Sequence, residues 1–191
     1  MPPALEPLLF SRQEEWAAWL RRNHDKSPGV WMRLAKKASG KGSVSYREAL
    51  EAALCYGWID ARKKGESETT WLQKFTPRAA KSIWSKINRE KALVLIKAGH
   101  MKPAGMAQIE RAKKDGRWEA AYDSLSSATP PPELQAALDQ NARAKAFYAT
   151  LNCQNRYAML FRIQTAKKPE TRIKRIQQFV EMLEKNEKLH P

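Results

Sequence analysis

The sequence contains little cysteine, histidine or glycine, and each shortage argues against a class of protein. Two cysteines, Cys55 and Cys153, lie far apart in the 191 residues, so a disulfide framework is not expected. Three histidines, and no His/Cys/Asp/Glu cluster at ligand spacing, argue against a metal site. The eight glycines are scattered and form neither a Walker loop nor a dinucleotide fingerprint. We therefore expect neither a metal nor a cofactor.

Long apolar runs are also missing. No segment approaches the roughly 20 apolar residues of a membrane-spanning helix. The N-terminal residues lack the basic region with which a signal peptide begins. Together with the sparse cysteines, these features predict a cytoplasmic, reduced protein without a membrane span.

Catalytic candidates are few. A nucleophilic site needs a serine or cysteine beside a base, usually histidine, with an orienting acid. His24 is in a helix-end turn, His100 follows a glycine, and His190 is at the C-terminus. Asp60 has a structural interpretation, in which it pairs with Arg62 two residues along the same strand or caps a neighbouring backbone turn. It also has a functional one, in which it accepts a donor from a ligand or acts as a general base. The sequence favours the pair, and with it a non-enzymatic protein.

Positive charge and tryptophan are abundant. The formal net charge is +15 and there are seven tryptophans. Residues 62–102 alone hold eleven Lys or Arg side chains against three acids. Such a concentration of positive charge attracts polyanions, including nucleic acid and acidic proteins. The alternative is a solvated basic surface with no specific partner.

Local patterns predict helices and strands in the first part of the chain. Ser11 to Glu14 and Ser45 to Glu48 both have the Ser-x-x-Glu spacing of a capping box, which predicts a helix start at each. Residues 30–35 alternate between apolar and polar as a strand does. Residues 58–63 and 69–75 are typical of two strands joined by a polar turn, so a hairpin is expected.

The later part of the chain is expected to be helical. Asn88 is predicted to cap one helix and Pro103 to stand in the first turn of the next. The SLSSATPPP stretch of residues 124–132 has no core pattern and is typical of a linker. The predicted fold class is therefore α+β, with a small, mostly antiparallel sheet and packed helices in residues 1–123. An all-helical C-terminal unit follows in residues 133–191.

Four stretches of the chain carry a resemblance to a known family. They read ALCYGWIDARKK, WLQKFTPRAAKSIWSKIN, AGHMKPAGM and NRYAMLFRIQTAKKPETRIKRI. These stretches resemble the YdeI/OmpD-associated family of small bacterial and fungal proteins, over about residues 29–187. The resemblance implies a cytosolic α+β domain with a helical C-terminal region and an association with bacteriocin protection or stress resistance. It implies no established reaction, cofactor or catalytic residue.

These observations predict a non-enzymatic binding protein of that family, with its ligand at the basic, tryptophan-containing region. The residues expected to face the ligand are Trp58, Asp60, Arg62, Lys74, Arg78, Trp84 and Lys86. The partner is a protein or a polyanion, and the oligomeric state is left open. The alternative is a nucleic-acid-binding module that uses the same basic hairpin, with cations along the phosphates and aromatic rings on the bases. For the tryptophans, core packing under lysine stems is the competing interpretation.

Overall fold

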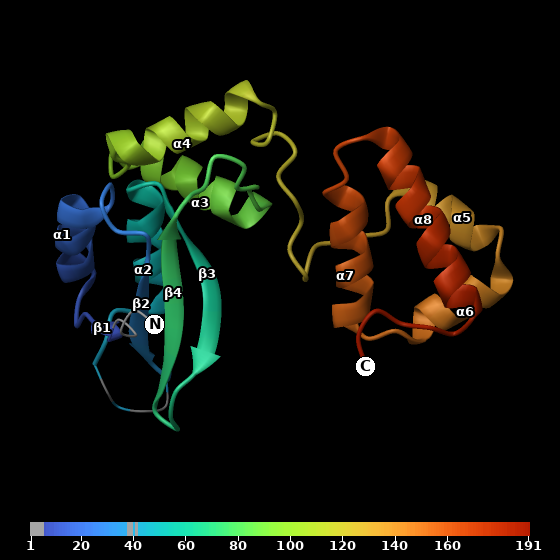
Figure 1. The fold of residues 1–191 in the computed structure, drawn as a ribbon, viewed down its shortest axis with the longest axis horizontal. Helices are drawn as coiled ribbons and strands as arrows, with labels where there is room; N and C mark the ends of the chain where they lie inside the picture. Colours follow the sequence, from blue (N-terminus) through green and yellow to red (C-terminus); the bar gives the residue numbers. More distant parts are fainter. Residues whose placement is uncertain (1–5, 38–39, 41) are drawn as a thin grey trace. The chain divides into compact units, whose positions relative to one another are not determined.

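The computed structural model describes residues 6–37, 40 and 42–191, which form two compact units (Figure 1). The first unit contains the described residues up to Trp84 together with Asn88–Glu119. The second contains Ser85–Ile87 and Ala120–Pro191. In the described part of the chain, no helix is both long and apolar enough to span a membrane.

The first unit is built on a four-stranded sheet. Its strands are β1 (Leu8–Leu9), β2 (Val30–Ala35), β3 (Trp58–Gly65) and β4 (Thr70–Pro77), in the order β1-β2-β4-β3. The central strand β4 pairs antiparallel with both β2 and β3, whereas β1 runs parallel to β2. The predicted α+β class and hairpin are confirmed, but the sheet is mixed because of the short parallel strand β1.

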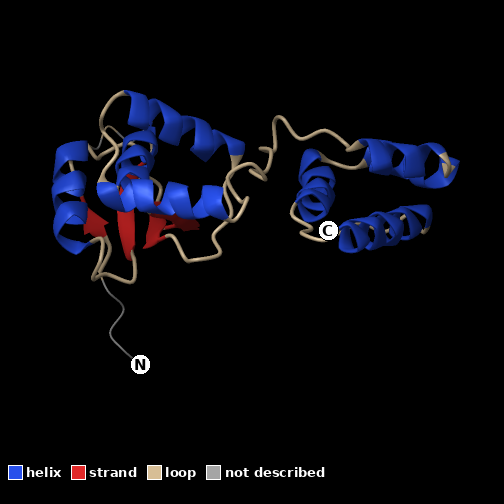
Figure 2. Cartoon of the chain, turned by 90° about the horizontal axis from the view of Figure 1, so that it is seen from above, coloured by secondary structure: helices blue, strands red, loops and turns tan. Residues whose placement is uncertain are grey.

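Four helices accompany the sheet. They are α1 (Gln13–Asn23), α2 (Tyr46–Cys55), α3 (Lys86–Lys97) and α4 (Pro103–Lys114). Figure 2 shows the strands with the helices of this unit along one side. Pro103 begins α4 as predicted. Asn88 does not cap a helix, because α3 already begins two residues earlier.

The two predicted capping boxes have different outcomes. At α2 the box is complete, since the Ser45 Oγ accepts from the Glu48 N–H at 3.2 Å and the Ser45 N–H donates to the Glu48 carboxylate at 2.9 Å. At α1 the prediction is wrong, because the N-cap is Arg12 and makes no side-chain cap bond. There the Ser11 N–H donates to Glu15 instead, at 2.8 Å. The helix therefore begins one residue later than predicted, and the two reciprocal hydrogen bonds of a capping box are replaced by a single bond from a backbone N–H.

The core of the first unit lies between one face of the sheet and the helices α1 and α2. Trp16 of α1 is fully buried, with ring centroids 5.7 Å from Phe75 and 6.1 Å from Trp58. The indole N–H groups of these two tryptophans both have partners: Trp16 donates to the Ala49 carbonyl and Trp58 to the His24 carbonyl, both at 3.0 Å. Burial of aromatic rings with satisfied N–H groups is the main stabilisation here.

The second unit is helical. Its helices are α5 (Pro132–Asp139), α6 (Ala142–Thr150), α7 (Cys153–Gln164) and α8 (Pro169–Glu184). They enclose a separate apolar core in which the buried side chains come from all four helices. Ala128, from the stretch expected to be a linker, packs against this core. The predicted helical C-terminal region is confirmed.

Candidate polyanion-binding face

Three of the residues expected to face a ligand are buried in the first unit. Trp58 is 1% exposed, Trp84 2% and Arg78 6%. The Arg78 guanidinium lies 3.5 Å from the centroid of the Trp84 ring and donates to the Ile83 carbonyl at 3.2 Å. The Trp84 ring in turn meets the edge of Trp118, with centroids 4.8 Å apart. This arrangement favours the competing interpretation, in which the tryptophans pack the core.

Asp60 and Lys86 have partners within the protein. The Asp60 carboxylate accepts a hydrogen bond from the Tyr46 hydroxyl of α2 at 2.8 Å. The Lys86 ammonium lies 2.6 Å from the carboxylate of Asp123, within the second unit. The charge of Lys86 is therefore already paired within the protein.

A register shift in β3 separates Asp60 from Arg62. Asp60 is opposite Phe75 of β4, but the shift that follows places Lys63 opposite Gln73. Two residues of β3 therefore oppose one residue of β4, which is the pattern of a β-bulge. The two-residue alternation on which the expected Asp60–Arg62 pair rested does not hold across this bulge. Arg62 itself is exposed.

The sheet has a second face, on the side away from α1 and α2, which we call the outer face. Directly opposite residues on neighbouring strands lie on the same face, and on this basis Trp31 joins Lys74, and Arg33 joins Leu72 and Lys64. In Figure 1 no helix of the unit crosses in front of β3 and β4. The outer face is formed by Leu9, Trp31, Arg33, Ile59, Lys64, Leu72, Lys74 and Thr76.

At the centre of the outer face a cation sits beside an aromatic ring. The Lys74 ammonium lies 5.9 Å from the centroid of the Trp31 ring, and both side chains are half-buried. A cation at this distance is attracted by the ring quadrupole. At the β1 edge of the same face, Leu9 is 56% exposed and adds apolar surface. The outer face thus combines an indole, aliphatic side chains and ammonium groups on one pleated surface.

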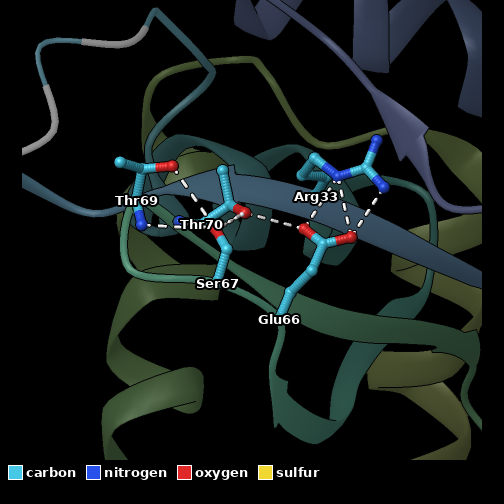
Figure 3. A network of polar contacts seen from close by, with 5 residues as sticks. All are labelled: Arg33, Glu66, Ser67, Thr69 and Thr70. Atoms are coloured by element: carbon cyan, nitrogen blue, oxygen red, sulfur yellow. Dashed lines mark hydrogen bonds and ion pairs between the residues drawn. The ribbon is translucent and has the colours of Figure 1, made fainter.

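A polar network closes the end of the outer face at the hairpin turn (Figure 3). The Arg33 guanidinium donates to both carboxylate oxygens of Glu66, at 2.6 to 2.9 Å. Thr70 donates to the same carboxylate, and Ser67 Oγ accepts from the N–H groups of Thr69 and Thr70. The hydrogen bonds from Arg33 lower the pKa of Glu66 to about 2. The positive charge of Arg33 is therefore paired with Glu66 at the turn. The positive charge that the outer face can offer to a ligand comes from its lysines.

Sequence reasoning missed Trp31 although its signal was present. In the stretch Val30–Ala35, Met32 and Leu34 are buried, while Trp31 and Arg33 alternate with them and point to the other side. An indole and a guanidinium on the polar side of an alternating strand indicate an aromatic surface that faces the solvent. The predicted residues were instead chosen in and around the hairpin because it is rich in charge. Of that predicted set, only Lys74 lies on the outer face.

The chemistry that the outer face supports is binding of an anionic, partly planar ligand. Ammonium groups attract phosphates, and an indole ring stacks on a base. In the part of the chain that the structure describes, no group of three or more His, Cys, Asp or Glu side chains has the arrangement of a metal site.

Two family models match the chain, one in each unit. A model described as a domain of unknown function (DUF8412) matches residues 8–108, and one described as "Bacteriocin-protection, YdeI or OmpD-Associated" matches residues 127–186. The YdeI/OmpD-associated resemblance is therefore found in the helical unit, and not over the expected 29–187. The whole sheet lies within the other match. No curated protein and no solved structure matches the chain.

Proposed function

The chain belongs to the DUF8412 family, and we propose that it is a non-catalytic binding protein that holds single-stranded nucleic acid on the outer face of its sheet. The observation that carries the proposal is the Lys74 ammonium 5.9 Å from the Trp31 ring, on a sheet face that no helix among the described residues of the first unit covers. Single-strand binders combine such aromatic faces with cations that follow the phosphates. The net charge of +15 adds a long-range attraction for the same ligand.

The preference for single strands follows from the indole. A base can stack on Trp31 only if it is not already paired and stacked inside a duplex, and each such stack contributes about 1–3 kcal/mol. Lys64 of β3 and Lys74 of β4 lie on the same face, and the exposed Arg62 lies two residues before Lys64 along β3, so several cations can follow one strand of phosphates. Double-stranded nucleic acid would gain the charge attraction but not the stack.

The setting that we propose is the cytoplasm, in bacteriocin protection or stress tolerance. The match of residues 127–186 to the bacteriocin-protection, YdeI or OmpD-associated model supports this setting. The two cysteines, both free thiols, suit a reducing compartment. A host strain lacking the protein should become more sensitive to bacteriocin, and Lys74→Glu should fail to restore resistance while Lys114→Glu restores it. Full restoration by Lys74→Glu would contradict the link between the outer face and this setting.

The binding test uses fluorescence anisotropy with 12-nucleotide poly(dT), poly(rU) and a matched duplex, from 50 to 200 mM salt. We expect the single strands to bind more tightly than the duplex, and the affinity to fall with salt because counterions are released. Lys74→Gln and Lys64→Gln should each lower the affinity and reduce the slope of log K against log salt by about 1. Trp31→Leu should weaken binding by about 1–3 kcal/mol.

The matched control is Lys114→Gln, which removes an exposed charge at the end of α4 and leaves the outer face intact. Thermal unfolding shows whether each variant is folded, and Lys74→Gln keeps the test decisive if Trp31→Leu is unstable. Equal losses for Lys74→Gln and Lys114→Gln would reduce the interaction to non-specific charge and refute the proposed site. Equal affinity for single strands and duplex would refute stacking on Trp31.

A further inference from the structure

A cavity in the first unit lies away from the outer face. Its volume is about 210 Å³, it opens to the solvent, and it is lined by residues of α1, of α2 and of the end of α3 with the loop that leads into α4. The loop is held against α2 by a hydrogen bond from the Lys102 N–H to the Cys55 carbonyl at 3.1 Å. The cavity therefore has walls from three separate parts of the sequence, and a backbone hydrogen bond holds the loop against α2.

The floor of the cavity is apolar and made of short side chains. Ala17, Ala52, Cys55 and Leu95 contribute to it, and the space exists because three of these four side chains are small. Burial raises the pKa of the Cys55 thiol to about 11, so the thiol is protonated and uncharged at neutral pH. A protonated buried cysteine behaves as a small apolar group. The floor therefore suits an aliphatic group.

The rim carries charges of both signs, from three different elements. Glu14 of α1 and Glu51 of α2 provide carboxylates, and Lys102 provides an ammonium group from the loop. Both Lys102 and Glu51 act electrostatically on the Cys55 thiol of the floor. The ion pairs of Glu51 with Arg47 and Lys91 both use the Oε1 atom. A ligand with one positive and one negative group would find a complementary charge at the rim for each of them.

We propose that this cavity binds a small zwitterion with an aliphatic side chain, of the class of apolar α-amino acids. The ligand carboxylate faces Lys102, its ammonium group faces Glu14 and Glu51, and its aliphatic group lies on Ala52 and Cys55. Pockets for drug-sized ligands span about 300–1,000 Å³, and a cavity of about 210 Å³ has room for a smaller molecule of this class. This site is independent of the nucleic-acid interface proposed above.

The test titrates the full-length, ¹⁵N-labelled protein with leucine, observed by ¹H–¹⁵N NMR. Two further probes each lack one charge: isopentylamine has no carboxylate, and 4-methylpentanoate has no ammonium group. We expect leucine to shift the amide signals of Ala17, Ala52 and Cys55. Each single-charge probe should bind about three- to tenfold more weakly, because one charged contact is lost.

Variants locate the site and the charged groups of its rim. Ala17→Leu fills the cavity from the half-buried side of α1 and should abolish the leucine shifts. Lys102→Gln and Glu14→Gln change exposed side chains of the rim and should each weaken leucine binding while leaving the spectrum folded. The matched controls are Lys97→Gln and Glu90→Gln, which alter exposed side chains of α3 that do not line the cavity.

Three results would overturn the proposal. The first is the absence of leucine-dependent shifts at the cavity residues up to millimolar concentration. The second is equal affinity for leucine and either single-charge probe, which would remove the requirement for both charges. The third is unchanged binding to Ala17→Leu, which would place the ligand elsewhere.

Discussion

The Arg33 guanidinium and the Glu66 carboxylate form a two-pronged pair, with Nε 2.8 Å from Oε2 and Nη2 2.6 Å from Oε1. The pair joins β2 to the turn between β3 and β4, which lies 33 residues away in the sequence. The turn of the hairpin is thus held by a strand that is adjacent to it only in the folded protein. Bidentate geometry of this kind is more specific than a single ion contact.

Stability should depend on this pair in a defined pH range. The folded-state pKa of Glu66, about 2, is below the value near 4.3 of an unperturbed glutamate. Its contribution is therefore fully present above about pH 4.3 and is lost as the pH falls through 2. The Arg33 side chain is 37% exposed, so we expect about 1 kcal/mol or less. Urea unfolding of the wild type and Glu66→Gln should differ at pH 6 and converge near pH 2.

The exposed Glu68 of the same turn is the control for that experiment. Glu68→Gln should leave the free energy of unfolding within about 0.5 kcal/mol of the wild type. A difference between wild type and Glu66→Gln that stays constant down to pH 2 would contradict the role given to the Glu66 carboxylate.

The two helix starts provide a matched pair of serine variants. Ser45→Ala removes the side-chain acceptor of a complete capping box and should destabilise the first unit by about 1 kcal/mol. Ser11→Ala should change the stability little, because the contact at α1 uses the Ser11 backbone N–H. Urea unfolding followed by circular dichroism measures both. Equal effects of the two substitutions would show that the box at α2 is not stabilising.

Gly105 should not tolerate a side chain. A Cβ at this position would lie 2.4 Å from the Cys55 carbonyl oxygen and 2.5 Å from the Met101 sulfur, so α2 and α4 would have to move apart. Overpacking of this kind costs about 1–3 kcal/mol, and we expect Gly105→Ala to lower the melting temperature accordingly. Gly65→Ala is the control, because a Cβ there meets no atom within 4 Å. Wild-type stability of Gly105→Ala would contradict the close approach of the two helices.

The two thiols should react at very different rates. Cys153 is exposed at the start of α7, whereas Cys55 is buried and its pKa of about 11 leaves it protonated. The thiolate is the reactive form. With a thiol-specific chromogenic reagent at pH 8 we expect one fast equivalent and one that appears only on unfolding. In Cys153→Ala the fast equivalent should vanish; its persistence would place Cys55 at the surface.

Much of the fold could be predicted because its signals are local. The strand Val30–Ala35, the hairpin and the box at Ser45 each follow from a few neighbouring residues. The parallel pairing of β1 could not be predicted, because Leu8–Leu9 is too short to show a period and its partner is more than twenty residues away. The start of α3 was predicted two residues too late, because the helix begins at Lys86, directly after Ser85, and serine favours the N-cap position as much as asparagine does.

The candidate site was harder to predict because burial depends on distant residues. Arg78 and Trp84 have the composition of a ligand site, yet the guanidinium covers the indole and both are buried. The face assigned to Arg62 relied on strict alternation, which the register shift after Asp60 interrupts. Trp31, by contrast, lies in a regular strand, and its position on the outer face follows from alternation alone.

The strand β3 forms an edge of the sheet, and its exposed residues include Arg62, Lys63 and Lys64 in succession, within and directly after the register shift. An edge strand offers unpaired N–H and C=O groups to any other extended chain, whereas lysines and bulges oppose that pairing. Two copies approaching edge to edge would bring these cations together. The basic run therefore also acts against polymerisation through the sheet, and acetylation of its lysines would weaken that protection.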